Sequence, residues 1–268
     1  MYKLIGLDMD GTLLNSQKQI SARTLAAIQA AKDKGIRIVL SSGRPIEGLR
    51  SYLEQLGLNG EHDYVVHYNG SFVENVMTGE IIRQQVISTA DARIIERTAR
   101  ELNVNTHAFS QTLGLITPQS TEYTRLEARL NGIEVHEINF DTLSDDHPMI
   151  KAMMVDEPEK LSQAYEKLPS YLAEQFTIVR SAPFFLEFLN PQSNKGLGIQ
   201  AVAERLGIPA ESVMCIGDAE NDHHMLEYAG LGVAMGNAMP QTKAIADYIT
   251  AGNDEDGVAE AIEKFVLY

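Results

Sequence analysis

The sequence predicts an α/β protein with a Rossmann-like parallel sheet, helices on both of its faces and an inserted α+β domain. Two observations predict this fold class. Over the first 70 residues, short apolar strand-like stretches alternate with helix-like stretches, which is typical of a parallel sheet covered by helices. From about residue 88 to 189 this alternation stops, and it resumes near Asn190-Pro191. We expect a core domain of residues 1–86 and 190–268 and an inserted domain of residues 87–189.

The elements of the first core segment follow from apolar stretches and helix boundary residues. Ser21 is a suitable N-cap for a helix, Gly35 is a suitable stop after it, and Pro45 suits the first turn of a second helix. The expected elements are a strand at 4–7, a helix at 22–34, a strand at 36–40, a helix at 45–56, a strand at 64–67 and a hairpin at 72–75 and 80–86.

The other two segments are assigned in the same way. In the insert we expect helices at 89–102, 121–130 and 157–168 and strands at 106–109, 113–117, 134–138, 150–155, 176–180 and 184–189. In the last segment we expect helices at 194–205, 222–229 and 240–246 and from 256, with strands at 213–216, 231–235 and 248–250.

The first strand ends in an acidic turn, Asp8-Met9-Asp10-Gly11-Thr12. Asp8 and Asp10 project to the same side of an extended segment, where they repel unless a cation lies between them or one is protonated. Gly11 lets the chain turn away sharply. These residues predict a site for Mg²⁺ and an anionic ligand, because Mg²⁺ binds carboxylates together with phosphate and water. An EF-hand is excluded, since its glycine and glutamate positions hold other residues.

Three further polar motifs follow strands or open a helix. Ser42-Gly43-Arg44 and Gly217-Asp218-Ala219-Glu220-Asn221-Asp222 each follow an apolar strand, and Lys195 opens a helix between them. Because ligands of open α/β sheets bind beyond the carboxyl ends of the strands, we expect these loops to converge.

Each motif has a suitable role in phosphoryl transfer, which needs positioning and charge neutralisation. Ser42 and Gly43 can bind phosphate oxygens, and Lys195 can neutralise charge on the phosphoryl group. Oxygens of Asp218 and Asp222 can bind the metal or its waters, while Asn221 can donate to phosphate. Alone, each motif is also typical of an ordinary turn or surface charge; the four together, in this order, favour a site.

Composition limits the partners and the compartment. The formal net charge of −15 argues against nucleic acid or an anionic membrane as a partner. The single cysteine, Cys215, lies in an apolar strand and excludes an intrachain disulfide, which is typical of a reducing compartment. With no apolar run near ~20 residues and no room for a signal peptide, we expect a cytoplasmic protein. His107, His136 and His147 have unrelated spacings, which predicts surface histidines rather than a metal site.

The four motifs resemble those of the haloacid dehalogenase superfamily of phosphatases, most closely its Cof-type members with a large α+β cap of the C2 type. The resemblance covers the whole chain. It implies a Mg²⁺-dependent phosphatase acting on small phosphorylated metabolites, with sugar phosphates the best match, and a cap that acts as a lid and recognises the leaving group. Arg44 and Tyr68-Asn69-Gly70 are expected to face the same space.

The resemblance also implies the role of each site residue. Asp8 would attack phosphorus and form an aspartyl-phosphate, and Asp10 would transfer protons to the leaving group and from water. The remaining roles are binding ones. The metal would be held by Asp8, the carbonyl of Asp10 and Asp218, with Asp222 supporting its waters or Lys195; the phosphoryl group would be held by Ser42, the backbone near Met9 and Gly43, Lys195 and Asn221.

Three other functions share parts of this pattern. A phosphomutase or phosphotransferase on the same scaffold stays open, and so does a phosphate-sensing switch, although such a receiver-like domain needs only about half this length. A dinucleotide oxidoreductase is poorly supported, because Gly230 and Gly232 lie late in the chain without a third glycine at the required spacing.

Overall fold

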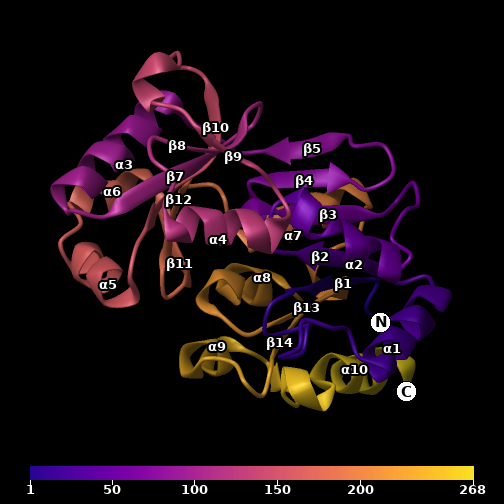
Figure 1. Cartoon of the computed structure of the whole chain (residues 1–268). Coiled ribbons are helices and arrows are strands. Elements are labelled where there is room, and N and C mark those ends of the chain that lie inside the picture. Colours follow the sequence, from indigo (N-terminus) through magenta and orange to yellow (C-terminus); the bar gives the residue numbers. More distant parts are fainter. The chain divides into compact units, whose positions relative to one another are not determined.

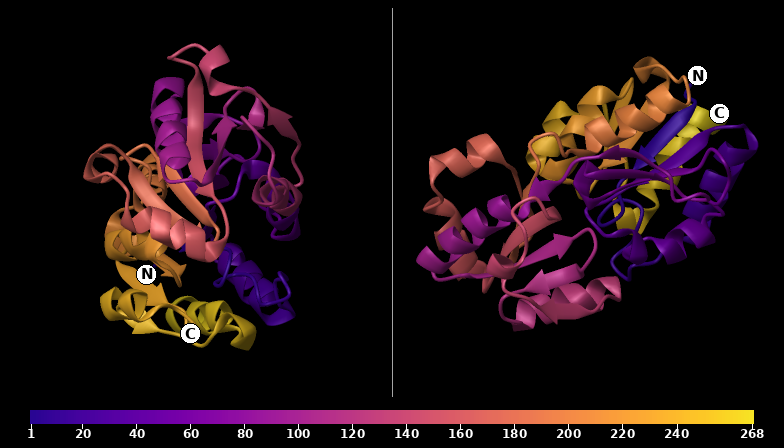
Figure 2. Two further views of the ribbon diagram at one scale, coloured as in Figure 1. Left: turned by 60° about the vertical axis from the view of Figure 1, so that its left-hand side comes forward. Right: turned by 90° about the horizontal axis from the view of Figure 1, so that it is seen from above.

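The chain folds into two compact units in the computed structural model, which describes residues 1–268. The first unit contains Met1–Gly43, Leu49–Gln84 and Asn194–Tyr268, and the second contains Arg44–Gly48 and Gln85–Ser193. The indigo and yellow ends of the chain therefore belong to one unit, while the magenta and salmon middle forms the other (Figure 1 and Figure 2). The fold is the predicted α/β fold with a parallel-strand sheet and an inserted α+β part.

The first unit is built on an eight-stranded sheet. Its strands in spatial order are β15 (Tyr248–Ile249), β14 (Leu231–Ala234), β13 (Val213–Gly217), β1 (Leu4–Leu7), β2 (Arg37–Ser41), β3 (Tyr64–His67), β4 (Phe72–Asn75) and β5 (Ile81–Gln84). The six strands from β15 to β3 are parallel, and β4 and β5 add an antiparallel edge. Because β1 lies between β2 and β13, the motifs that follow these three strands leave the same edge of the sheet.

Helices accompany this sheet in the first unit. They are α1 (Ala22–Asp33), α2 (Arg50–Gln55), α7 (Lys195–Arg205), α8 (His223–Tyr228), α9 (Pro240–Ile245) and α10 (Gly257–Ile262). All of them except α9 bury at least one apolar side chain. Helix α7 packs closely, since a Cβ on Gly6 would lie 2.8 Å from Ile199 Cδ1 and one on Gly198 would lie 2.4 Å from Val66 Cγ1. Asn194 caps α7 by accepting from the Leu197 amide at 2.8 Å. Close packing and the cap fix the first residue of α7 at the edge where the motifs meet.

The second unit is an α+β unit with its own hydrophobic core. Its sheet has the order β11 (Thr177–Ala182), β12 (Phe185–Leu189), β10 (Pro148–Val155), β7 (Asn105–Ser110), β8 (Gly114–Thr117) and β9 (Val135–Glu137), and β6 (Ile87–Ser88) pairs with β10. Its helices are α3 (Thr89–Glu101), α4 (Glu122–Asn131), α5 (Pro158–Glu166) and α6 (Ser170–Gln175). Apolar residues of α3, α5 and α6 form one cluster with Ala152, Met154 and Phe188 of the sheet.

Three sequence-based expectations differ from the structure. The helix expected at 45–56 is a 3₁₀ turn at Ile46–Gly48 followed by α2, and a Cβ on Gly48 would lie 2.9 Å from Asn131 Oδ1. Helix α6 was not expected; it has only six residues, too few for a clear periodic pattern. His107 is fully buried rather than on the surface, and burial lowers its pKa to about 3, with the Lys151 charge as a smaller cause.

None of the helices combines the length with the apolar composition that a membrane span requires.

Candidate active site

Lys195 lies between two buried carboxylates. Its Nζ is 2.6 Å from Asp8 Oδ1 and 2.6 Å from Asp222 Oδ1, and its side chain is 0% exposed. Asp8 directly follows β1, Lys195 is the first residue of α7, and Asp222 closes the 3₁₀ turn after β13. Asp8 lies 187 positions from Lys195 in the sequence, and Asp222 lies 27 positions from it. The three residues nevertheless form one ion-paired group at the carboxyl edge of the sheet.

Asp222 uses both carboxylate oxygens inside this group. Oδ1 accepts from Lys195, and Oδ2 accepts from the backbone amides of Asp218 at 2.9 Å and Ala219 at 3.0 Å. The carboxylate therefore holds the loop after β13 and the ammonium of Lys195 together. Of the predicted roles of Asp222, the structure shows the contact with Lys195, and binding of the metal or its waters stays a prediction.

Three carboxylates form a group that fits a divalent cation. One oxygen each of Asp8, Asp218 and Asp222 lies within 4.8 Å of the others. Thr12 Oγ1 donates to Asp218 Oδ1 at 2.8 Å, and a Cβ on Gly11 would lie 2.5 Å from Asp218 Oδ2. Carboxylate oxygens are the ligands that Mg²⁺ prefers, so the donor set suits this ion.

Burial, followed by the charges of this group, shifts the pKa values of its members. Burial, followed by the charge of Asp222, raises the pKa of Asp8 well above its usual value, although the Lys195 ammonium opposes this rise. Burial and Asp222 likewise raise the pKa of Asp218. Burial lowers the pKa of Lys195, but the carboxylates of Asp222 and Asp8 raise it by more, so Lys195 stays protonated. The group therefore has an excess of negative charge that a cation can offset.

Mg²⁺ is expected to stabilise the protein more at about pH 8 than at about pH 5. Because the pKa values of Asp8 and Asp218 are raised by folding, their protonation stabilises the metal-free protein at low pH, and this contribution is lost as the pH rises through the raised values. Metal binding needs the ionised carboxylates and is therefore stronger at the higher pH. Thermal unfolding with EDTA and with Mg²⁺ measures the difference. The expectation would be contradicted if Mg²⁺ raised the melting temperature equally at both pH values, or if it raised the melting temperature of Asp218→Asn as much as that of the wild type.

Asp10 has a different environment from Asp8. Its side chain is 40% exposed, and its carboxylate pairs with Lys18 Nζ at 2.7 Å. The group of three carboxylates does not include it. A half-exposed carboxyl two residues after Asp8 can exchange protons with a ligand, but both predicted roles of Asp10, proton transfer and metal binding through its carbonyl, stay predictions.

The predicted phosphate-binding residues lie on neighbouring loops. Ser42 is buried, its amide donates to the Val66 carbonyl at 2.9 Å, and its carbonyl accepts from the Asn69 amide at 2.9 Å. The Asn221 side chain donates to Asn69 Oδ1 at 3.0 Å. The motifs after β2 and β13 are thus joined through Asn69.

Met9 and Arg44 complete the set of predicted binding residues. Met9 is fully buried, and its carbonyl accepts from the Leu14 amide at 2.9 Å. Arg44 belongs to the second unit, where its guanidinium donates to the Gly48 carbonyl at 3.4 Å. Sequence reasoning gave no role to Thr12, whose hydroxyl orients Asp218; its place at the end of the acidic turn was the available signal.

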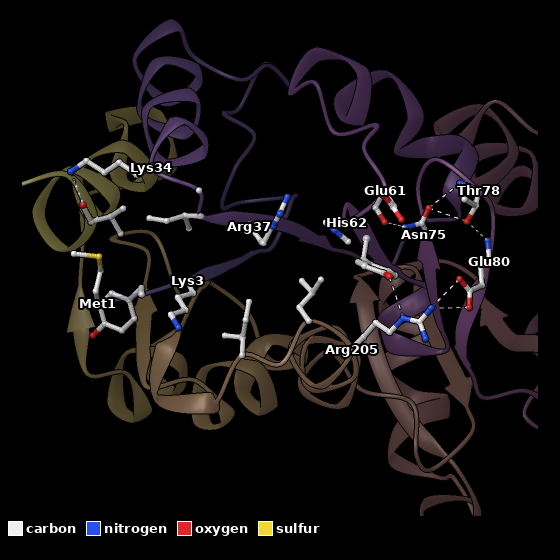
Figure 3. A pocket seen from close by; sticks show the side chains of 17 residues that line it. Met1, Lys3, Lys34, Arg37, Glu61, His62, Asn75, Thr78, Glu80 and Arg205 are labelled. Carbon is white, nitrogen blue, oxygen red and sulfur yellow. Dashed lines mark hydrogen bonds and ion pairs between the residues drawn. The ribbon is translucent and has the colours of Figure 1, made fainter.

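A cavity of about 740 Å³ lies at the opposite edge of the same sheet (Figure 3). Lys3 and Arg37 at the amino ends of β1 and β2 line it, together with His62 before β3. None of the predicted site residues contributes to this cavity. It is therefore separate from the acidic group.

The chain is similar in sequence and in fold to known hydrolases and phosphatases. The family model for haloacid dehalogenase-like hydrolases matches residues 5–262. The chain is 41% identical over 269 residues to YxeH of Bacillus subtilis (strain 168), covering 100% of this chain and 99% of that protein. It is 33% identical over 265 residues to the 5-amino-6-(5-phospho-D-ribitylamino)uracil phosphatase YcsE of the same organism, covering 99% and 96%. Among solved structures it is similar to the sugar phosphatase BT4131 of HAD subclass IIB, with a TM-score of 0.83, 26% identity and coverage of 99% and 100%.

Proposed function

The chain belongs to the haloacid dehalogenase-like hydrolase family and is a phosphatase of phosphoric monoesters, and we propose that it hydrolyses small sugar phosphates with Mg²⁺ through an aspartyl-phosphate on Asp8. The observation that carries the proposal is the buried Asp8–Lys195–Asp222 group beside Asp218. It combines a carboxylate nucleophile, a fixed positive charge and oxygen ligands for a cation.

In the first step, a carboxylate oxygen of Asp8 attacks phosphorus as the bond to the ester oxygen breaks. Asp10 gives its proton to the departing oxygen and then takes a proton from the water that attacks the aspartyl-phosphate. Inorganic phosphate leaves, and Asp8 returns to its carboxylate form. The 40% exposure of Asp10 supports contact with both the ester oxygen and water, and its carboxylate must exchange the ion pair with Lys18 for a proton before it acts as the acid.

The remaining residues bind and neutralise the phosphoryl group. Lys195 supplies a buried positive charge next to the attacked phosphorus, and Ser42, Gly43 and Asn221 supply donors to its oxygens. Asp8, Asp218 and the Asp10 carbonyl would hold Mg²⁺, which would supply charge neutralisation at this site.

The inserted residues 87–189 are proposed to recognise the leaving group as a lid. The second unit buries Lys151 and Glu187, whose Nζ and Oε2 are 2.9 Å apart, and it also buries Glu127. Burial raises the pKa of Glu127 above its usual value. Buried charges are costly to desolvate and contribute weakly to stability, which supports a functional reason for them, such as hydrogen bonds to the hydroxyl groups of a sugar.

Phosphate release from a panel of esters tests the proposed substrate class. We expect sugar phosphates to give kcat/KM values at least about tenfold above those of phosphorylated uracil, flavin and pyridoxal compounds, since a site of donors and acceptors rejects ligands that leave them unpaired. EDTA should abolish the release, and Mg²⁺ should restore it. A preference for 5-amino-6-(5-phospho-D-ribitylamino)uracil would assign the substrate of YcsE instead. A requirement for a sugar bisphosphate with little free phosphate would identify a phosphomutase, and a stable phosphoprotein without turnover would identify a switch.

A further inference from the structure

The turn after β3 has an unusual backbone. Tyr68, Asn69 and Gly70 have φ values of +50°, +54° and +88°, so three consecutive residues lie in the left-handed region. Asparagine tolerates this region, but tyrosine rarely adopts it. Such a conformation persists only where the surroundings hold it, and it is found at functional sites more often than elsewhere. All three residues are buried, so this turn is not a mobile surface loop.

This turn contacts two of the four predicted motifs and the N-cap residue that precedes Lys195. The Asn69 amide donates to the Ser42 carbonyl at 2.9 Å, and a Cβ on Gly43 would lie 3.0 Å from Asn69 Nδ2. Gly70 lies against the N-cap of α7, since a Cβ on Gly70 would be 2.1 Å from the Asn194 carbonyl oxygen. The third contact is the hydrogen bond from Asn221 Nδ2 to Asn69 Oδ1 at 3.0 Å.

The contact with Asn221 fixes the orientation of that side chain. An amide group has two N–H donors and one carbonyl acceptor. Asn69 Oδ1 accepts one of the two donors of Asn221, which leaves the second donor for a ligand. Because Asn69 is only 2% exposed, water does not readily replace this acceptor. The conformation of the turn therefore determines where the free donor of Asn221 is held.

We propose that Asn69 is a positioning residue for the phosphoryl group: its side chain orients the Asn221 amide, and its backbone amide fixes the carbonyl of Ser42. This inference rests on the proposed roles of Ser42 and Asn221 in phosphate binding. The left-handed turn is needed for both contacts at once, because it directs the backbone amide of Asn69 to one loop and its side chain to another.

Asn69→Gly is the informative variant, because glycine adopts the left-handed region freely and removes only the side chain. We expect this variant to melt close to the wild-type temperature and to lose about tenfold in kcat/KM, as expected for one hydrogen bond that orients a ligand group. Asn103→Gly is the matched control: Asn103 also has a left-handed φ of +59° but is exposed at the end of α3. Its kcat/KM should equal that of the wild type.

A double-mutant cycle separates positioning from a general structural role. Once Asn221→Ala has removed the group that Asn69 orients, adding Asn69→Gly should lower kcat/KM by less than about twofold. Asn69→Asp keeps the acceptor and should largely retain kcat, while its negative charge raises the KM for an anionic ester. Equal losses of kcat/KM from Asn69→Gly in both backgrounds, or no loss in either, would overturn the proposal.

Binding of inorganic phosphate in the presence of Mg²⁺, measured by calorimetry, gives a readout that does not need turnover. We expect Asn69→Gly to weaken it about tenfold, and undiminished binding would contradict the inference. If the wild type binds phosphate but hydrolyses no ester, the proposed function fails while the role of Asn69 stands. If Asn69→Gly does not fold, the comparison of Asn69→Asp with the wild type decides the matter, because loss of kcat in that variant would refute the role of the acceptor.

Discussion

Replacement of Asp8 with asparagine is expected to lower kcat by at least about a thousandfold while leaving the fold intact. An amide does not attack phosphorus, so the proposed aspartyl-phosphate could not form. The Asn side chain still offers an oxygen to Lys195, which donates to Asp8 Oδ1 at 2.6 Å. Burial and Asp222 already raise the pKa of Asp8, so a neutral side chain is compatible with this environment. Phosphate release and thermal unfolding, both with Mg²⁺, measure the two effects.

The matched control for this change is Asp33→Asn on α1. Asp33 is exposed, and its carboxylate accepts from Gln29 on the same helix. The same chemical change there should alter neither kcat nor the melting temperature measurably. If Asp8→Asn retained a tenth or more of the wild-type kcat, Asp8 would not be the nucleophile.

Replacement of Lys195 with methionine is expected to destabilise the fold by about 3–5 kcal/mol, because it leaves buried charges without their partner. Asp8 and Asp222 both lose the ammonium that bonds them, and neither side chain is more than 8% exposed. We also expect kcat to fall roughly a hundredfold or more, since the positive charge next to the phosphoryl group is lost. Denaturant unfolding and steady-state kinetics with Mg²⁺ measure the two losses.

Two further variants show whether unpaired buried charge causes the loss of stability in Lys195→Met. Lys160→Met removes a lysine of α5 that is 40% exposed and pairs with Asp156, which precedes that helix, and it should cost less than about 1 kcal/mol. Adding Asp222→Asn to Lys195→Met removes one of the unpaired charges and should restore part of the lost stability. A Lys195→Met protein as stable as the wild type would mean that the carboxylates are protonated or solvated rather than paired.

The four motifs could be found in the sequence because each lies next to a strong local signal. Asp8 follows Leu4–Leu7, and Asp218 follows Val213–Gly217; both strands are buried throughout and are therefore apolar at every position. Buried parallel strands produce such runs, and the polar residues that end them are conspicuous. The cap at Asn194 marks the start of α7 in the same local way.

Local signals failed where a distant residue decides the conformation. The helix expected from Pro45 breaks at Gly48, which approaches Asn131 closely. His107 is buried through contacts with Thr124 and Met153, far from it in sequence. Neither contact leaves a pattern in the residues next to it, so composition and spacing could not reveal either one.

The sequence by itself determined which chemical groups this protein possesses: paired aspartates after a strand, a hydroxyl loop, a lysine at a helix start and a second acidic loop. Only the tertiary structure decided their partners. It placed the Lys195 ammonium between Asp8 and Asp222, turned the Asp222 carboxylate toward backbone amides and put Asn69 between Ser42 and Asn221. The physical reason is that the contacts of Asp8 with Lys195 and of Asn69 with Asn221 join segments far apart in the chain, and the order of strands in the sheet brings those segments together.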